Sequence, residues 1–158
     1  MKRYFDDLNI GEKAQSKPYI MTEKGISDFI SCSGDSHPIH TDKEYCQKHP
    51  LVRDCTVQGV LTLGVADGMM AREILPEDIL LIHYGSDHVR YLMPVYPGDE
   101  IHIETEITDM KIRDDRFGLV WYHVAVKNQN GEPVLVFEDL MLIERDARRK
   151  MNEHISGI

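Results

Sequence analysis

Residues 33–42 combine the side-chain types that move protons near neutral pH. This stretch reads SGDSHPIHTD and contains the carboxylate of Asp35 and the imidazole of His40. An imidazole changes charge near neutral pH, and a nearby carboxylate makes a proton-transfer pair with it. Gly34 permits a turn that other residues resist, and Pro38 restricts both its own φ and the residue before it. We therefore expect a shaped loop, and not plain helix or strand, that holds Asp35 and His40 together. The alternative is that Asp35 caps a turn and His40 is an ordinary loop residue.

Two further histidines, His37 and His49, lie close to this pair in the sequence. We interpret His37 as a structural residue that holds the loop through a ring hydrogen bond. A metal site would be supported by a ligand pair four residues apart on a helix, and the set His37, His40, His49 and Asp42 offers none. We therefore expect no metal here.

The longest apolar stretch, residues 58–75, predicts a buried helix that Pro76 ends. Gly59 lies near its start, where free N–H groups and the helix dipole could hold a developing oxyanion, although many helices begin near a glycine. Gly64 and Gly68 would each cost roughly 1 kcal/mol against alanine in a helix interior. They indicate that a sheet, a ligand or both approach this helix closely.

Asp67 is an acid within this apolar helix. Buried carboxylates are rare unless they are paired or functional. A catalytic role, a hydrogen-bonding partner and a dimer interface are all open for Asp67 at this point.

The rest of the sequence predicts the helices, loop and strands that must position these residues. Thr22 could cap a helix with Ile26, Phe29 and Ile30 on one face that ends at Ser33–Gly34, and Asp42 could cap a short helix through residue 46. Residues 50–57 form a loop. Strands are predicted at residues 19–21, 100–108, 119–127 and 133–143, with a hairpin turn at residues 128–131. Residues 79–82 and 87–92 form one further candidate strand that is interrupted near Tyr84–Gly85. Short connections favour antiparallel pairing, so we expect an α+β domain whose sheet wraps around the long helix.

Composition narrows the class of protein. The 158 residues suit a single domain, 1–158, with residues 146–158 as a C-terminal tail. A net charge of −9 argues against a general nucleic-acid binder.

We found no signal peptide and no apolar run of membrane-spanning length, so we expect a cytoplasmic protein without membrane contact. The three cysteines form no CxxC pair and are expected to be reduced thiols. The basic residues Arg145, Arg148, Arg149 and Lys150 are expected to be the solvated end of the last element.

Three segments resemble one family in order and spacing. Residues 34–42, GDSHPIHTD, resemble the motif G-D-x-N-P-[IL]-H-x-D of the MaoC-like dehydratases and (R)-specific enoyl-CoA hydratases. Residues 57–61, VQGVL, resemble the family's V-H-G-M-L segment, and residues 89–99, VRYLMPVYPGD, resemble its R-F-x-x-P-V-x-x-G-D segment. The resemblance implies a hot-dog fold, a homodimer or a higher homo-oligomer, and a place in fatty acid metabolism.

The resemblance also implies roles for particular residues. Asp35 and His40 would position and activate a water that adds to a trans-2-enoyl thioester, giving a 3-hydroxyacyl product reversibly. The Gly59 N–H would hold the thioester oxygen as it becomes enolate-like. His37, Pro38, Gln58, Asp67 and Arg90 are the expected substrate-binding residues. Coenzyme A would be the carrier of the substrate and not a bound cofactor. Arg53, Arg90 and Arg113 are candidates for contacting its phosphates.

The sequence departs from the family pattern at three positions. His37 replaces the usual asparagine, Gln58 replaces a histidine, and Asp67 stands where (R)-hydratases commonly carry a serine. The third change puts the acyl-chain preference in doubt more than the reaction class. Two other functions are open: a hot-dog thioesterase that uses Asp67, and a non-catalytic acyl-CoA-binding protein.

Overall fold

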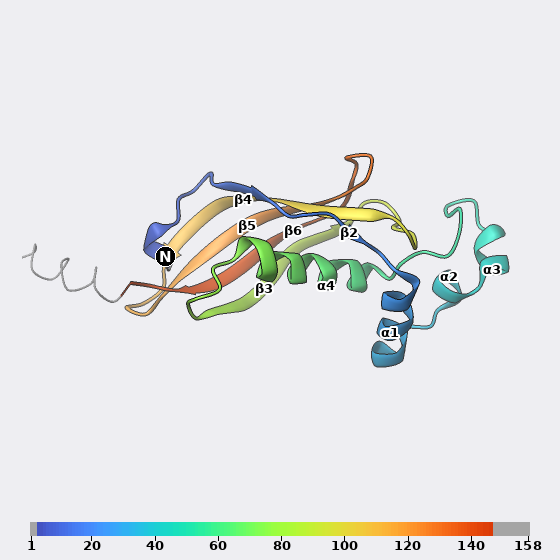
Figure 1. Ribbon diagram of the computed structural model, residues 1–158, viewed down its shortest axis with the longest axis horizontal. Helices are drawn as coiled ribbons and strands as arrows, with labels where there is room; N and C mark the ends of the chain where they lie inside the picture. The colour runs from blue at the N-terminus through green and yellow to red at the C-terminus, as the bar shows by residue number, and fades with distance from the viewer. Residues whose placement is uncertain (1–2, 147–158) are drawn as a thin grey trace, which may run out of the picture.

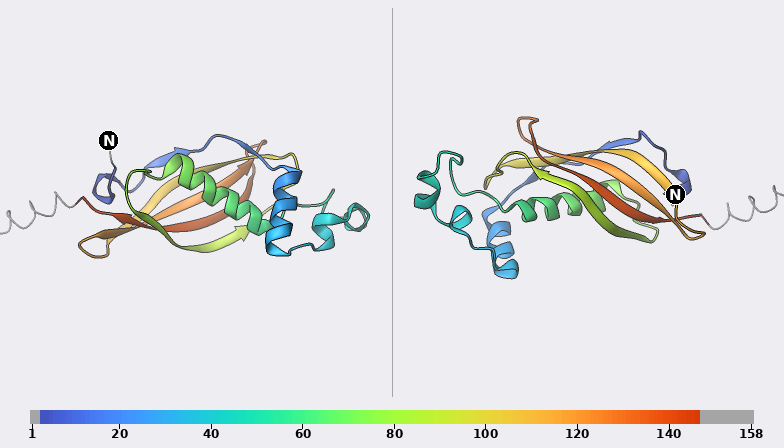
Figure 2. Two further views of the ribbon diagram at one scale, coloured as in Figure 1. Left: turned by 60° about the horizontal axis from the view of Figure 1, so that its bottom comes forward. Right: turned by 180° about the vertical axis from the view of Figure 1, so that it is seen from behind.

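The structure is a computed structural model that describes residues 3–146. One antiparallel sheet curves over a single long helix, α4 (Figures 1 and 2). The strand order is β1-β4-β5-β6-β3, and β2 also pairs with β4. This arrangement confirms the predicted α+β fold with a sheet wrapped around a helix. Apart from its first residue, the expected tail at 146–158 lies outside the described residues.

The sheet is built from six strands, and all but the short first one were predicted from the sequence. Their bounds are β1 Lys13–Gln15, β2 Tyr19–Ile20, β3 Leu81–Tyr91, β4 Glu100–Ile112, β5 Phe117–Asn128 and β6 Pro133–Glu144. Ile101, Ile103 and Ile107 are buried, as the period-two pattern requires. The single strand predicted over 79–82 and 87–92, with an interruption near Tyr84–Gly85, is β3, and two register shifts absorb its irregular residues.

Helix α4, Gly59–Met69, lies against one face of the sheet and continues into a π-helical turn, η2, at Met70–Ile74. Its inward side includes Ala66, Met69 and Met70, which are completely buried. The prediction that this helix is buried all round is wrong for the single chain, since Val60 is 60% exposed. The apolar outer face therefore has no cover within the described part of the chain.

Helix α1, Glu23–Ser33, begins and ends where the sequence predicts. The Thr22 side chain accepts a hydrogen bond from the Gly25 N–H at the N-terminus. Gly34 ends the helix with φ 76°, a left-handed conformation that favours glycine. The chain thus turns sharply just before Asp35.

Two short helices follow, α2 at Pro38–Thr41 and α3 at Lys43–Gln47. The prediction that residues 33–42 form only a loop is wrong for α2, because Pro38 at the first helical position starts a single turn that includes His40. Asp42 caps α3 as predicted, by accepting a hydrogen bond from Tyr45 N–H. Helices α1, α2 and α3 gather beyond the N-terminal end of α4 (Figure 1).

The start and end of the described chain are joined by an ion pair. Arg145 follows β6, is only 6% exposed, and donates two hydrogen bonds to one carboxylate oxygen of Asp6 in η1, Phe5–Asp7. The prediction that Arg145 belongs to a solvated basic end is therefore wrong; Arg148, Arg149 and Lys150 lie outside the described residues. Among residues 3–146, none of the helices is long and apolar enough to cross a membrane.

Candidate active site

His40 is held in one tautomer by the backbone. Its Nδ1 lies 2.7 Å from the carbonyl oxygen of Thr56. A carbonyl can only accept, so Nδ1 carries a proton, and Nε2 is an acceptor whenever the ring is neutral. That Nε2 lies 3.9 Å from Oδ2 of Asp35. This distance is too long for a direct hydrogen bond, but one water molecule can bond to both groups.

Asp35 is positioned through its backbone, which leaves its carboxylate facing His40. Its N–H donates to Ser33 Oγ at 3.1 Å, and its carbonyl accepts from Gln58 Nε2 at 3.2 Å. The Asp35 side chain is 44% exposed and that of His40 is 14% exposed. The pair thus has one half-exposed carboxylate and one largely enclosed imidazole.

Gln58 and His37 act as supports within this arrangement. Gln58 is 1% exposed and connects the start of α4 to the Asp35 backbone, while its Oε1 has no partner among the described residues. His37 Nδ1 accepts a hydrogen bond from Ile39 N–H, which confirms the predicted ring hydrogen bond. Pro38 starts the helical turn that includes His40.

Gly59 is the first residue of α4, where the N–H groups of the first turn have no intrahelical partner. The preceding Gln58 gives no side-chain cap to these groups. A Cβ at residue 59 would lie 2.9 Å from the Tyr91 ring. Glycine therefore allows Tyr91 to pack directly over the helix N-terminus.

A pocket of about 440 Å³ brings these groups together. Asp35, His40 and Gly59 all line it, so the structure unites the three residues that the sequence singled out as catalytic. Its other lining residues are mostly apolar, namely Ile39, Val52, Val57, Val60, Leu92, Met93, Pro94, Val95 and Val134, with Thr56, Thr62 and Tyr91. Tyr91 was missed by the sequence reasoning, although it lies inside the third matched segment, residues 89–99.

None of the five expected substrate-binding residues lines this pocket; His37, Pro38 and Gln58 support its loop and helix start, and Arg90 and Asp67 point elsewhere. Arg90 is exposed, and its guanidinium donates to the Val89 carbonyl. Asp67 points elsewhere, with Oδ1 3.8 Å from Nδ1 of His83 on β3. Arg113, a candidate for phosphate contact, lies over the Tyr84 ring at 5.4 Å.

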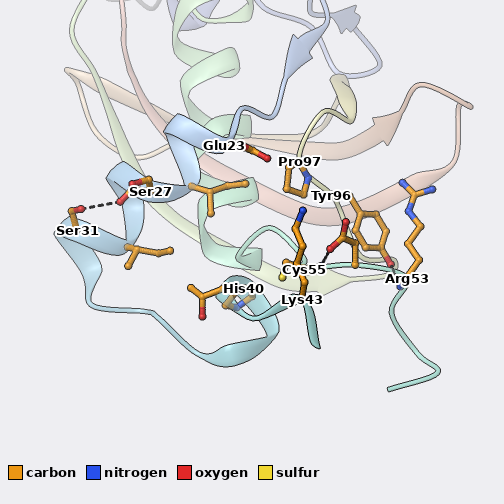
Figure 3. Close-up of a pocket in the computed structure, with 13 residues that line it drawn as sticks. Glu23, Ser27, Ser31, His40, Lys43, Arg53, Cys55, Tyr96 and Pro97 are labelled. Atoms are coloured by element: carbon orange, nitrogen blue, oxygen red, sulfur yellow. Dashed lines mark hydrogen bonds between the residues drawn. The ribbon is translucent and has the colours of Figure 1, made fainter. Parts of the chain in front are cut away.

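A second groove, of about 630 Å³, is also lined by His40 (Figure 3). It runs between α1 and the loop around Cys55, and it includes the cationic side chains of Lys43 and Arg53. The Arg53 guanidinium lies 4.2 Å above the Tyr96 ring and 3.4 Å from Asp99. His40 lines both spaces, so a long molecule could reach it from the cationic groove.

The site offers three chemical functions at one place. The imidazole and carboxylate can hold a water and exchange protons with it. The α4 N-terminus can stabilise negative charge on an oxygen. The apolar lining can accept a hydrocarbon chain and exclude bulk water.

The chain matches known proteins over most of its length. The family model described as MaoC like domain matches residues 7–128. The (R)-specific enoyl-CoA hydratase of Aeromonas caviae is 26% identical over 110 residues, covering 69% of this chain and 76% of that protein. The uncharacterized protein YdeM of Bacillus subtilis is 24% identical over 140 residues, covering 89% and 98%.

Solved structures are similar to this chain as well. A structure described as a monoamine oxidase regulatory protein from Archaeoglobus fulgidus superposes with a TM-score of 0.84 and 34% identity, and the match covers 92% of this chain and 96% of that chain. The hot-dog fold expected from the sequence is confirmed by such neighbours. The match over residues 7–128 places the chain in the MaoC-like domain family.

Proposed function

We propose that the protein catalyses the reversible hydration of a trans-2-enoyl-CoA thioester to a 3-hydroxyacyl-CoA. The observation that carries this proposal is the His40–Asp35 pair. Nε2 of His40 lies 3.9 Å from the Asp35 carboxylate, within a pocket that also contains the N-terminus of α4. The similarity to an (R)-specific enoyl-CoA hydratase supports the same reaction class.

In the proposed reaction, a water bonded to Asp35 and His40 attacks the β-carbon of the enoyl group. The pair accepts one proton from the water, and the hydroxyl group adds to the β-carbon. The electrons of the double bond shift toward the thioester oxygen, which the Gly59 N–H holds while it carries negative charge. A proton from the pair then goes to the α-carbon. Dehydration follows the same steps in reverse.

The coenzyme A part of the substrate would enter along the groove that Lys43 and Arg53 line. His40 also lines this groove, and the charge of the two cations suits the phosphates of coenzyme A. The acyl chain would then occupy the apolar pocket beyond Asp35. Arg53 is partly engaged by Asp99 and Tyr96, so Lys43 is the freer of the two cations within the described residues.

We further propose a homodimer formed along strand β3. This strand lies at the edge of the sheet and pairs only with β6 in the described part of the chain. It exposes large apolar side chains, with Ile82 at 46% and Tyr84 at 55%. A long edge strand with apolar side chains favours pairing with another chain.

The hydratase proposal is tested by turnover of the conjugated thioester. Crotonyl-CoA and longer or polar enoyl-CoAs are mixed with the protein, and the loss of absorbance of the conjugated thioester is followed. We expect Asp35→Asn and His40→Ala to lower kcat by roughly a hundredfold to ten-thousandfold each, as for lost acid–base groups. The matched control is His49→Gln, an exposed histidine just after α3 that lines neither space. Wild-type rates in both pair variants would contradict the mechanism.

A thioesterase that uses Asp67 gains no support from the geometry, because Asp67 does not line the pocket with Asp35 and His40. Free-thiol release from acyl-CoA that is lost in Asp67→Ala and kept in Asp35→Asn would favour the thioesterase. A protein that binds acyl-CoA but turns over none of a broad thioester panel would instead be a binding protein.

A further inference from the structure

Strand β6 carries an acid in the row of residues that faces the core. Alternate residues of this strand, Leu135, Phe137, Met141 and Ile143, are each at most 2% exposed. Asp139 occupies the same row and is only 1% exposed. A carboxylate in such a position is costly unless other groups compensate it, so Asp139 requires an explanation beyond packing.

The surroundings of Asp139 satisfy only half of its carboxylate. Its Oδ1 lies 2.9 Å from Nε2 of His83 and 3.4 Å from Oγ of Ser86. Its Oδ2 is buried and has no hydrogen-bond partner among the described residues. Burial raises the pKa of this carboxyl, and the nearby His83 opposes the rise. The carboxylate thus lacks one partner.

A β-bulge brings His83 and Ser86 to the same side of the sheet. His83 pairs with Met141 and Ser86 with Asp139, and the register shifts between residues 83 and 85. Side chains three residues apart on a regular strand point to opposite faces of the sheet. The extra residue of the bulge turns the His83 and Ser86 side chains to the same face. Hence Ser86 Oγ lies 3.0 Å from His83 Nε2.

Asp67 completes the group from α4. Its Oδ1 lies 3.8 Å from Nδ1 of His83, and its side chain is 47% exposed. Asp67, His83 and Asp139 can each offer one ligand atom, and these atoms lie within 4.8 Å of one another. One ion bonds to a single ring nitrogen, and bonds of about 2.0–2.2 Å would hold the three donors roughly 3–3.5 Å apart, so the half-exposed Asp67 and the His83 ring would both need to shift by roughly an ångström.

We propose that Asp67, His83 and Asp139 form a binding site for one divalent transition-metal ion of the zinc type. One imidazole and two carboxylates are donors that zinc accepts, whereas calcium and magnesium prefer oxygen alone. A dication would neutralise both carboxylates and could engage the unpartnered oxygen of Asp139. In the single chain, the half-exposed Asp67 and His83 leave a path for entry. This site is separate from the pocket of Asp35 and His40, and it departs from our expectation of a protein without a metal site.

The rival explanation is an ion pair, in which a protonated His83 sits between two carboxylates and binds no metal. The test uses the purified full chain, treated with EDTA and then dialysed. Co²⁺ is titrated while its visible d–d absorption is recorded, and Zn²⁺ binding is measured by calorimetry. We expect one ion per chain, with binding weakened on the order of a hundredfold in His83→Ala and Asp67→Asn. Removing a metal ligand should lower metal affinity at least as much as removing a residue that hydrogen-bonds to a ligand.

His88→Ala is the matched control, because His88 is an exposed histidine of the same strand beside Glu138. It should keep wild-type Co²⁺ binding, and so should Asp35→Asn. Asp67→Asn is a same-sized change at a half-exposed position, so it keeps the test valid if His83→Ala does not fold. No binding by the wild type, equal binding by Asp67→Asn, or loss of binding in His88→Ala would each overturn the proposal.

Discussion

The orientation of His40 depends on a backbone carbonyl and not on another side chain. The Thr56 carbonyl accepts a hydrogen bond from Nδ1 of His40, and Asp35 faces the other ring nitrogen, Nε2. The carboxylate and the imidazole are thus two groups that face one shared space. This geometry suits a water held between them, which is the reactant that the proposed hydration requires.

The three cysteines should differ sharply in reactivity. Cys32 is exposed, whereas Cys46 and Cys55 are buried with their sulfurs 3.5 Å apart. Burial raises the pKa of the Cys55 thiol to about 11, so little thiolate forms at neutral pH. We expect iodoacetamide to modify Cys32 first and Cys55 on the order of a hundredfold more slowly, as read by peptide mass spectrometry. Equal rates would show that this buried pair opens readily.

The single residues of the site were only partly predictable. Asp35 and His40 stand in one compact motif, residues 34–42, and Gly59 stands in a second short segment, residues 57–61, so their types and order indicate their chemistry. Asp139 was missed by the sequence reasoning, although an acid within an apolar strand is a local signal, and no local signal identifies its partner His83. That contact depends on the β3–β6 register and on a bulge, and both are set by long-range pairing.

At the level of elements, the N-terminus of α4 can be tested by two glycines of the same helix. A Cβ at Gly59 would lie 2.9 Å from the Tyr91 ring, whereas a Cβ at Gly64 meets no described atom within 4 Å. We expect Gly59→Ala to lower kcat by roughly tenfold to a hundredfold, because it displaces groups at the reacting oxygen. Gly64→Ala should keep the rate and raise the free energy of unfolding by about 0.5–1 kcal/mol.

These outcomes are measured by steady-state kinetics and by urea unfolding at a fixed protein concentration. A fully active Gly59→Ala would remove the α4 N-terminus from the mechanism. A destabilised Gly64→Ala would show that another chain packs against this face of the helix.

Elements whose ends are set by neighbouring residues followed the sequence closely. The Thr22 cap, the left-handed Gly34 and the Asp42 cap all involve contacts within a few residues. The prediction failed where the outcome depends on distant parts of the chain. The outer face of α4 is apolar in sequence, yet it is exposed in the single chain because no described segment covers it.

For the whole molecule, the β3 edge and the exposed apolar side chains predict self-association. We expect light scattering after size exclusion to give a mass of at least two chains. Ile82→Lys should shift the protein toward the monomer, because a charge on an edge strand opposes strand pairing. Ile10→Lys is the control, since Ile10 is 61% exposed and precedes β1 at the opposite edge of the sheet. A monomeric wild type, or equal effects of the two lysines, would argue against a β3 interface.

The most direct test of the proposed function follows the oxygen atom of water. An enoyl-CoA is incubated with the protein in water labelled with oxygen-18, and the products are analysed by mass spectrometry. We predict that the label appears in the hydroxyl group of an intact 3-hydroxyacyl-CoA, and that Asp35→Asn forms this product far more slowly. Label found instead in a released carboxylic acid, or an enoyl-CoA that stays unchanged across chain lengths, would contradict the proposed function.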